Sequence, residues 1–219
     1  MSTADDTEHW WGTLTGLNVT YLERWGSAWA DLLATKNALA ERVLVDHAQP
    51  SNLFLRRALW ESAVVSYGRL AVSDRKRRIE FKDFVKEVTG EDGLKIHERI
   101  MDWRHGHVAH RTGAEFESAE TVLAFLNGTD VPTEIHLVLE IDLGPLDHGE
   151  FATAFRDHVD VLSAAVYERK IRVFARKIID DLNAGRITQP PLLHTPAAES
   201  TWERYILDQC VAKIRFNSG

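Results

Sequence analysis

The fold is decided largely by residues 148–183, which read HGEFATAFRDHVDVLSAAVYERKIRVFARKIIDDLN. Large apolar residues recur in this stretch, mostly three or four positions apart: Phe151, Phe155, Val159, Leu162, Val166, Phe174, Ile178 and Leu182. This spacing places them on one side of a long α-helix that other helices must cover. Asp147 and Glu150 fit a capping box at its start, and Gly185 is a typical residue after a helix end.

Three segments nearer the N-terminus repeat the helical period, at about 17–47, 51–71 and 80–88. The second carries an apolar stripe of Leu53, Trp60, Val64, Tyr67 and Ala71. The third should close at Gly90, and a further helix should begin at residues 91–92, because two acids in a first turn favour the positive end of the helix dipole. That helix carries the stripe Ile96, Ile100 and Trp103. The chain is therefore predicted to be a mainly α protein.

The period changes after Gly113. Residues 120–126 are predicted to form a strand, and apolar residues alternate with the others over 135–142, as in a strand with one buried face. The turn residues 127–130 stand between the two segments. A β-hairpin is therefore expected over about 120–142, inserted in the helical bundle. Because an isolated hairpin is marginally stable in water, one of its faces should pack on the helices.

These patterns divide the chain into three parts. Residues 1–14 are expected to form a flexible arm carrying Trp10 and Trp11, and residues 15–185 the helical domain with its hairpin insertion. Residues 186–219 should form a linker and a C-terminal amphipathic helix at about 198–214.

The composition limits the possible classes of protein. The chain has 219 residues, 44% hydrophobic and 27% charged, which is typical of a globular protein. Its net charge of -7 excludes nucleic-acid binding through bulk charge. The single cysteine excludes an internal disulfide and a Cys-based zinc cage, as in a reducing cytosol. With no signal peptide and no long apolar run, we expect a cytoplasmic protein that does not contact a membrane.

The sequence RHGHVAHR, which begins at Arg104, holds three of the ten histidines between two arginines. In a regular helix Arg104, His107 and Arg111 share one sector, His110 borders it and His105 points away. Guanidinium groups bind phosphate oxygens through paired hydrogen bonds, and histidine can give or take a proton near neutral pH. The pattern therefore indicates a site for a phosphodiester.

A metal site is not expected at this motif. Only His107 and His110 lie on the same helical face, whereas metal ligands must converge. Cleavage of RNA without a metal needs a proton acceptor for the ribose 2′-hydroxyl and a proton donor for the leaving oxygen. The residues predict no cofactor and favour RNA over DNA, because only RNA has the 2′-hydroxyl.

The motif Arg104-His105-x4-His110 resembles the signature of HEPN domains, and its ending, Ala109-His110-Arg111, resembles that of abortive-infection-type members. The helix around Leu59–Leu70 is also similar to the helix that precedes the motif in that family. The resemblance covers roughly residues 15–180, but only the seven-residue motif is specific.

The resemblance implies an up-down helical bundle that pairs as a homodimer, with a metal-independent ribonuclease site formed across the interface. Arg104 would hold or polarise the phosphate, His110 would be the acid or base, and His105 occupies the polar position after the arginine. Many members are toxins or antiviral effectors, while others are inactive modules. The family's core has no counterpart to the hairpin.

The sequence thus predicts an endoribonuclease of a prokaryotic defence or toxin system, with RNA, a second copy and a possible antitoxin or regulatory protein as partners. The expected substrate-binding residues are His107, Arg111, Arg75, Lys76, Arg77 and Arg78. The basic run at 75–78 has a second interpretation as a solvated loop beside acidic neighbours. The alternative function is a non-catalytic HEPN-like module for dimerisation and protein or nucleotide binding. A regulatory partner of a neighbouring enzyme is a third.

One geometric conflict remains within the motif. In a regular helix Arg104 and His110 are about 120° apart. They can serve one phosphate if the helix ends or distorts near Ala109, or if a second subunit completes the site.

Overall fold

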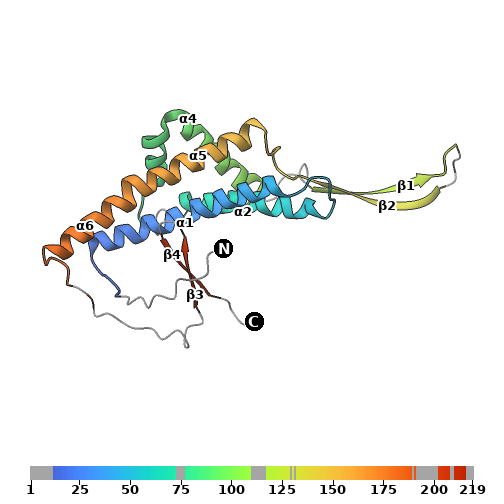
Figure 1. The fold of residues 1–219 in the computed structure, drawn as a ribbon. Helices are drawn as coiled ribbons and strands as arrows, with labels where there is room; N and C mark the ends of the chain where they lie inside the picture. The colour runs from blue at the N-terminus through green and yellow to red at the C-terminus, as the bar shows by residue number, and fades with distance from the viewer. Residues whose placement is uncertain are drawn as a thin grey trace.

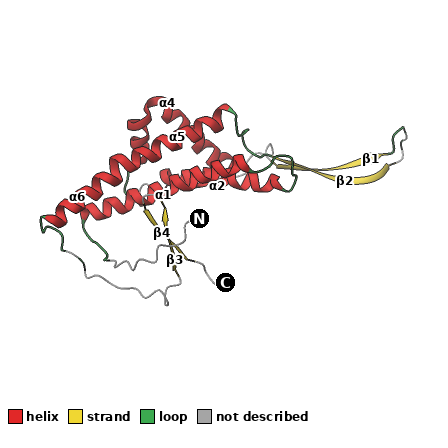
Figure 2. Cartoon of the chain, viewed as in Figure 1, coloured by secondary structure: helices red, strands yellow, loops and turns green. Residues whose placement is uncertain are grey.

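The protein is mainly helical, as the sequence predicted (Figure 2). The computed structural model describes residues 12–72, 77–109, 117–128, 130, 132–188, 190, 202–207 and 210–215. Its helices are α1 (Leu17–Leu44), α2 (Asn52–Val72), α4 (Phe81–Trp103), the π-helix η1 (Arg104–Ala109), α5 (Glu150–Val166), the π-helix η2 (Tyr167–Ile171) and α6 (Arg172–Asn183). Helix α1 packs against α2, α5 and α6, and α4 packs against α2 and α5.

The core lies where α1, α2, α4 and α5 meet (Figure 1). The stripe predicted on α2 supplies its centre, because Trp60, Val64 and Tyr67 are all buried. The largest fully buried apolar side chains are Trp60, Tyr67, Phe81, Phe155, Leu32, Leu70, Ile100 and Leu162. Burial of such side chains contributes on the order of 2 kcal/mol each. The helical period thus marked the right faces.

The long helix predicted over 148–183 forms as α5, η2 and α6 in succession. Gly185 follows its end with φ 69°, a left-handed conformation that glycine adopts without strain. The predicted capping box does not form. Gly149 is the N-cap residue of α5 and no side chain caps it. Asp147 instead turns inward, to a buried ion pair described below.

Two helices predicted around Gly90 are joined in α4. The backbone is non-helical at Gly90 alone, with φ 68° and ψ -162°, so the chain kinks there and continues. Glycine tolerates this conformation because it has no Cβ. The kink redirects the second half of α4, which leads to Arg104.

The predicted hairpin consists of β1 (Glu117–Phe125) and β2 (Pro132–Ile141), paired antiparallel. It projects beyond the bundle in Figure 1, and every residue of β2 except Ile141 is exposed. The expectation that one face packs on the helices is therefore wrong. The strands are about 30 Å long, so most of the hairpin extends past the helix ends at its root.

The predicted C-terminal helix is also wrong. Residues there form two antiparallel strands, β3 (Trp202–Leu207) and β4 (Cys210–Arg215). Strand β3 contains Trp202, Tyr205 and Ile206, and β4 contains Val211 and Ile214. Aromatic and β-branched residues favour extended backbone, and this preference outweighs the helical spacing. The arm that carries Trp10 and Trp11 lies outside the described residues. Within the described part of the chain, no helix is long and apolar enough to cross a membrane.

Candidate functional site

The predicted motif begins where α4 changes into the π-helix η1. Arg104 follows the last α-helical residue, Trp103, and its backbone N–H donates to the carbonyl oxygens of Ile100 and Met101. From Arg104 to Ala109 the backbone is a π-helix. Short π-helices are rare and often mark functional sites. The backbone thus departs from a regular α-helix up to Ala109, and the direction of His110 relative to Arg104 stays a prediction.

The side chain of Arg104 is held against α2 at Gly68. A Cβ atom added to Gly68 would lie 1.9 Å from Cδ and 2.5 Å from Nε of Arg104. Glycine is therefore required for this close approach. Arg104 is half-buried. Among the described residues, none gives its guanidinium a carboxylate at ion-pair distance. Its charge is available for an external anion.

The remaining motif residues are placed less completely. His105 is exposed on η1, and Gly106 follows it. The backbone of His107 belongs to the same π-helix. His110 and Arg111 lie outside the described residues, so the spacing between Arg104 and His110 stays a prediction.

An aromatic cluster packs around Trp103, the residue that precedes the motif. Trp103 packs edge-on against Trp60, with ring centroids 5.4 Å apart. Trp60 also contacts Phe151 and Phe155 of α5 edge-on. Edge-to-face pairs add about 1 kcal/mol each beyond their burial. These contacts fix the end of α4 relative to α2 and α5.

A buried polar network joins the same three helices. The Tyr67 hydroxyl lies 2.8 Å from Nδ1 of His97 and 2.9 Å from Nε2 of His158. The hydroxyl has one proton, so it donates to one imidazole and accepts an N–H from the other. Burial lowers the pKa of both histidines to about 4, with Lys82 further lowering that of His97. Both rings are therefore neutral at pH 7, and the network positions α4 two turns before Arg104.

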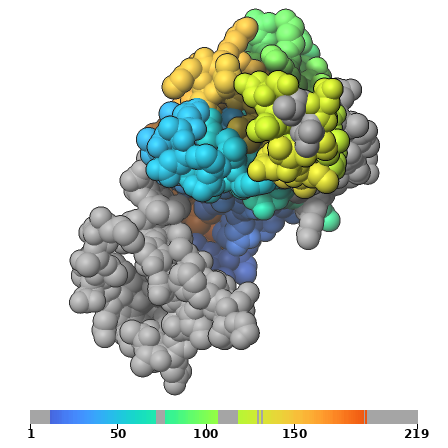
Figure 3. Space-filling model, turned by 90° about the vertical axis from the view of Figure 1, so that its right-hand side faces the viewer, coloured from blue at the N-terminus to red at the C-terminus, as the bar shows by residue number. Residues whose placement is uncertain are grey.

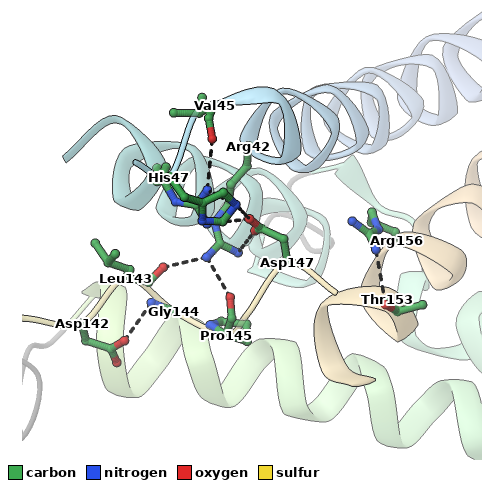
Figure 4. Close-up of polar contacts among 11 residues, drawn as sticks. Arg42, Val45, His47, Asp142, Leu143, Gly144, Pro145, Asp147, Thr153 and Arg156 are labelled. Carbon is green, nitrogen blue, oxygen red and sulfur yellow. Dashed lines mark hydrogen bonds and ion pairs between the residues drawn. The ribbon is translucent and has the colours of Figure 1, made fainter. Parts of the chain in front are cut away.

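A second buried cluster ties the root of the hairpin to the α1–α2 corner (Figure 4). The Asp147 carboxylate pairs with Arg42 at 3.0 Å and Arg56 at 2.5 Å, and all three side chains are at most 5% exposed. Arg42 also donates to the carbonyl oxygens of Leu143 and Pro145. Burial lowers the pKa of Arg42, and Asp147 opposes this effect. The cluster holds the chain that enters α5.

The structure describes two of the four residues of the predicted basic patch, Arg77 and Arg78. Arg75 and Lys76 lie outside the described residues. Arg77 is only 16% exposed and binds the Asp31 carboxylate at 2.5 Å, so its guanidinium is already neutralised. Arg77 is not part of a solvated loop either, because its side chain is largely buried. The proposed site therefore does not include Arg77.

Arg78 lines an open hollow of about 510 Å³ on another part of the molecule. Lys170 of η2 covers the floor of this hollow, with its ammonium 5.1 Å from the ring centroids of both Trp25 and Phe84. None of the described motif residues lines it. The hollow and the motif are therefore separate features.

The sequence analysis did not predict the Tyr67–His97–His158 network or the Arg42–Asp147–Arg56 cluster. The sequence does contain a signal for the first of them. His158 stands seven residues after Phe151 and three after Phe155, on the inner stripe of α5. His97 stands three residues before Ile100 on the inner stripe of α4. A histidine on an apolar stripe needs a polar partner when it is buried, and Tyr67 on the facing stripe supplies it.

Comparison with known proteins adds no family. No family model, no curated protein and no solved structure matches the chain. In the part of the chain that is described, no three His, Cys, Asp or Glu residues converge as metal ligands. The functional interpretation therefore rests on the motif residues and on the geometry around Arg104.

Proposed function

We propose that this protein is a metal-independent endoribonuclease of a prokaryotic defence or toxin system, with an Arg/His site completed across a homodimer. One observation carries the proposal. Arg104 is anchored over Gly68 at the start of a π-helix, and no described carboxylate neutralises it. A half-buried, uncompensated guanidinium is well suited to bind a phosphodiester.

The proposed chemistry assigns one task to each group. Arg104 binds the phosphate oxygens and stabilises the charge that develops on them. A histidine accepts the proton of the ribose 2′-hydroxyl as its oxygen attacks phosphorus, and a proton is returned to the leaving 5′-oxygen. His110 is the proposed acid or base. A second subunit would supply the partner group, as the resemblance to HEPN domains implies.

RNA cleavage by purified protein tests this function. We expect wild type to cleave single-stranded RNA in the presence of EDTA. Arg104→Ala and His110→Ala should each lower the rate by about 10²-fold or more. His148→Ala, which changes an exposed histidine outside the motif, is the matched control and should keep the wild-type rate. If His110→Ala cleaves as fast as wild type, the catalytic assignment is wrong.

A second function is favoured by a different observation. The β1–β2 hairpin exposes large apolar side chains on both strands, which is typical of an interaction surface. The second candidate function is accordingly a non-catalytic HEPN-like module that binds a protein or nucleotide partner. Absence of RNA cleavage by wild type, together with a stable complex, would favour this function over the first.

A further inference from the structure

The β1–β2 hairpin has two chemically different faces. Residues of a strand alternate between faces, so cross-strand pairs two positions apart share one face. One face carries the pairs Ala119–Leu139, Thr121–Leu137 and Leu123–Ile135. The other carries Ser118–Glu140, Glu120–Val138, Val122–His136 and Ala124–Glu134. We call the first set the apolar face. These three pairs contain no charged residue, and the charged residue on the same side of β1 is Glu117, at the root of the hairpin opposite Ile141. The opposite face contains three glutamates, Glu120, Glu134 and Glu140.

The apolar face is open to solvent. Ile135 is 71% exposed, Leu137 65%, Leu139 55% and Leu123 52%. A two-stranded hairpin is marginal in water unless its apolar side is packed against something. The bundle does not cover this face, because the hairpin projects from its end (Figure 1). Among the described residues, none of the bundle helices covers this face, so it is free to take an occupant.

The area of the apolar face limits what that occupant can be. Two strands about 30 Å long and about 5 Å apart present a footprint of roughly 300 Å². A stable protein interface needs about 800 Å² from each partner. The occupant must therefore also contact apolar surface next to the hairpin.

Such surface exists at both ends of the hairpin. At the tip, Phe125 is 55% exposed. At the root, Leu44 is 75%, Phe54 59% and Leu146 81% exposed. These three residues lie on segments that the Arg42–Asp147–Arg56 cluster holds together. Figure 3 shows the hairpin emerging beside the α1–α2 corner at this end of the molecule.

We propose that the occupant is a second copy of this chain, with the two hairpins packed antiparallel, apolar face on apolar face. A twofold axis through the middle of the hairpins places the tip of each beside the root of the other. The same patches are then used by both copies, as a twofold interface requires. Phe125 of one copy meets the patch of Leu44, Phe54 and Leu146 of the other. The three glutamates of the opposite face point outward in both copies.

This interface goes beyond the proposed function, because packing tip to root places the partner's hairpin, and not its motif, at the root of the hairpin. Its formation does not rest on that function. Dimerisation follows from the exposed apolar surface alone and can be measured without RNA.

Sedimentation velocity of the full chain tests the dimer. We expect wild type to sediment at about twice 24.9 kDa at micromolar concentration. Leu137→Lys, on the apolar face, should raise the dimer dissociation constant at least tenfold. Val138→Lys is the matched control, because it adds the same charge one residue further along β2. Val138 lies on the opposite face of the hairpin and pairs with Glu120 of β1. A wild-type monomer at all concentrations overturns the proposal and assigns the face to another protein. Equal effects of the two lysines also overturn it.

A disulfide experiment tests the antiparallel arrangement. In a chain with Cys210→Ser, we expect the pair Phe125→Cys and Leu146→Cys to form a dimer linked by disulfides upon oxidation. Within one subunit these positions are separated by the length of the hairpin, about 30 Å, whereas a disulfide needs Cα atoms within about 7 Å. Any 125–146 disulfide therefore joins two copies. Efficient linkage of Phe125→Cys alone would indicate tips that meet, and would overturn the tip-to-root arrangement.

The two readouts separate this inference from the proposed function. If wild type cleaves RNA as a monomer, the dimer is wrong and the cleavage stands. If wild type is a dimer through this face and cleaves no RNA, the ribonuclease is wrong and the interface stands.

Discussion

The side chain of Arg104 lies across the backbone of Gly68, so closely that a methyl group on Gly68 would come within 1.9 Å of its Cδ. The contact joins η1 to the middle of α2. It also leaves the guanidinium half-buried but not paired with any described carboxylate. The position of the Arg104 guanidinium thus depends on the absence of a side chain at Gly68 of α2.

Gly68→Ala should therefore displace Arg104 and impair RNA cleavage. Alanine favours a helix over glycine by about 1 kcal/mol, which offsets part of the steric cost, so the fold should survive. We expect cleavage to fall toward the rate of Arg104→Ala, with a normal circular dichroism spectrum. Gly26→Ala is the control, because a Cβ there meets nothing within 4 Å. Full activity of Gly68→Ala would show that the position of Arg104 is unimportant.

Asp147→Ala should be among the most destabilising single changes in the protein. It leaves the guanidinium groups of Arg42 and Arg56 buried without their carboxylate. Breaking a buried ion pair on one side costs about 3–5 kcal/mol. Urea unfolding followed by circular dichroism measures the loss.

Two controls separate this role from the capping box that the sequence suggested. Glu150→Ala should cost less than about 1 kcal/mol, because no side chain caps α5. Asp160→Ala removes a surface pair with Lys36, in which both side chains are more than half exposed, and should also cost less than about 1 kcal/mol. If Glu150→Ala is as damaging as Asp147→Ala, the capping interpretation is restored.

The sequence predicted most of the bundle because apolar spacing reports which side of a helix is buried. In the stripe predicted on α2, Trp60, Val64 and Tyr67 are buried, and its two end members, Leu53 and Ala71, are half-buried. The spacing of apolar residues was a weaker guide where one sequence is compatible with both a helix and a strand. The C-terminal segment has helical spacing and strand-forming residues, and the strands β3 and β4 form.

The site was predicted less completely, because side-chain pairing depends on distant parts of the chain. Asp147 resembles a cap in its local sequence, and only the fold brings Arg42 and Arg56 to it. In the local sequence Arg77 has the appearance of an unpaired cation. Only the fold brings Asp31, 46 residues earlier, to within hydrogen-bond distance of it. Local sequence identified the motif at Arg104, but not the glycine that positions it.

Stability should fall as the pH is lowered from about 6.5 to 4. Burial lowers the pKa of His97 and His158 to about 4 in the folded protein, whereas unfolded histidine has a pKa near 6.5. In this range the unfolded state binds more protons, so each histidine lowers the free energy of unfolding by about 1.4 kcal/mol per pH unit. Urea unfolding between pH 7 and 4.5 measures this slope.

Carboxylates also titrate in the lower part of this range, so His158→Phe provides the comparison. The variant lacks one of the two buried imidazoles, and its slope should be smaller than that of wild type by about 1.4 kcal/mol per pH unit. Identical slopes for wild type and variant would mean that His158 is protonated in the fold, contrary to its buried contact with Tyr67.

Gly144→Ala should destabilise the root of the hairpin through two separable effects. Gly144 has φ 80°, where a side chain is strained by about 1–2 kcal/mol. A Cβ there would also lie 2.7 Å from Cδ1 of Trp60, which is 2% exposed and has no room to move. Gly128 has the same φ of 80° but nothing within 4 Å. Gly128→Ala therefore reports the strain alone, and Gly144→Ala should lose about 1–3 kcal/mol more by urea unfolding, which is the usual cost of overpacking a core. Equal losses would mean that Trp60 yields and that the loop is not packed on the core as the structure has it.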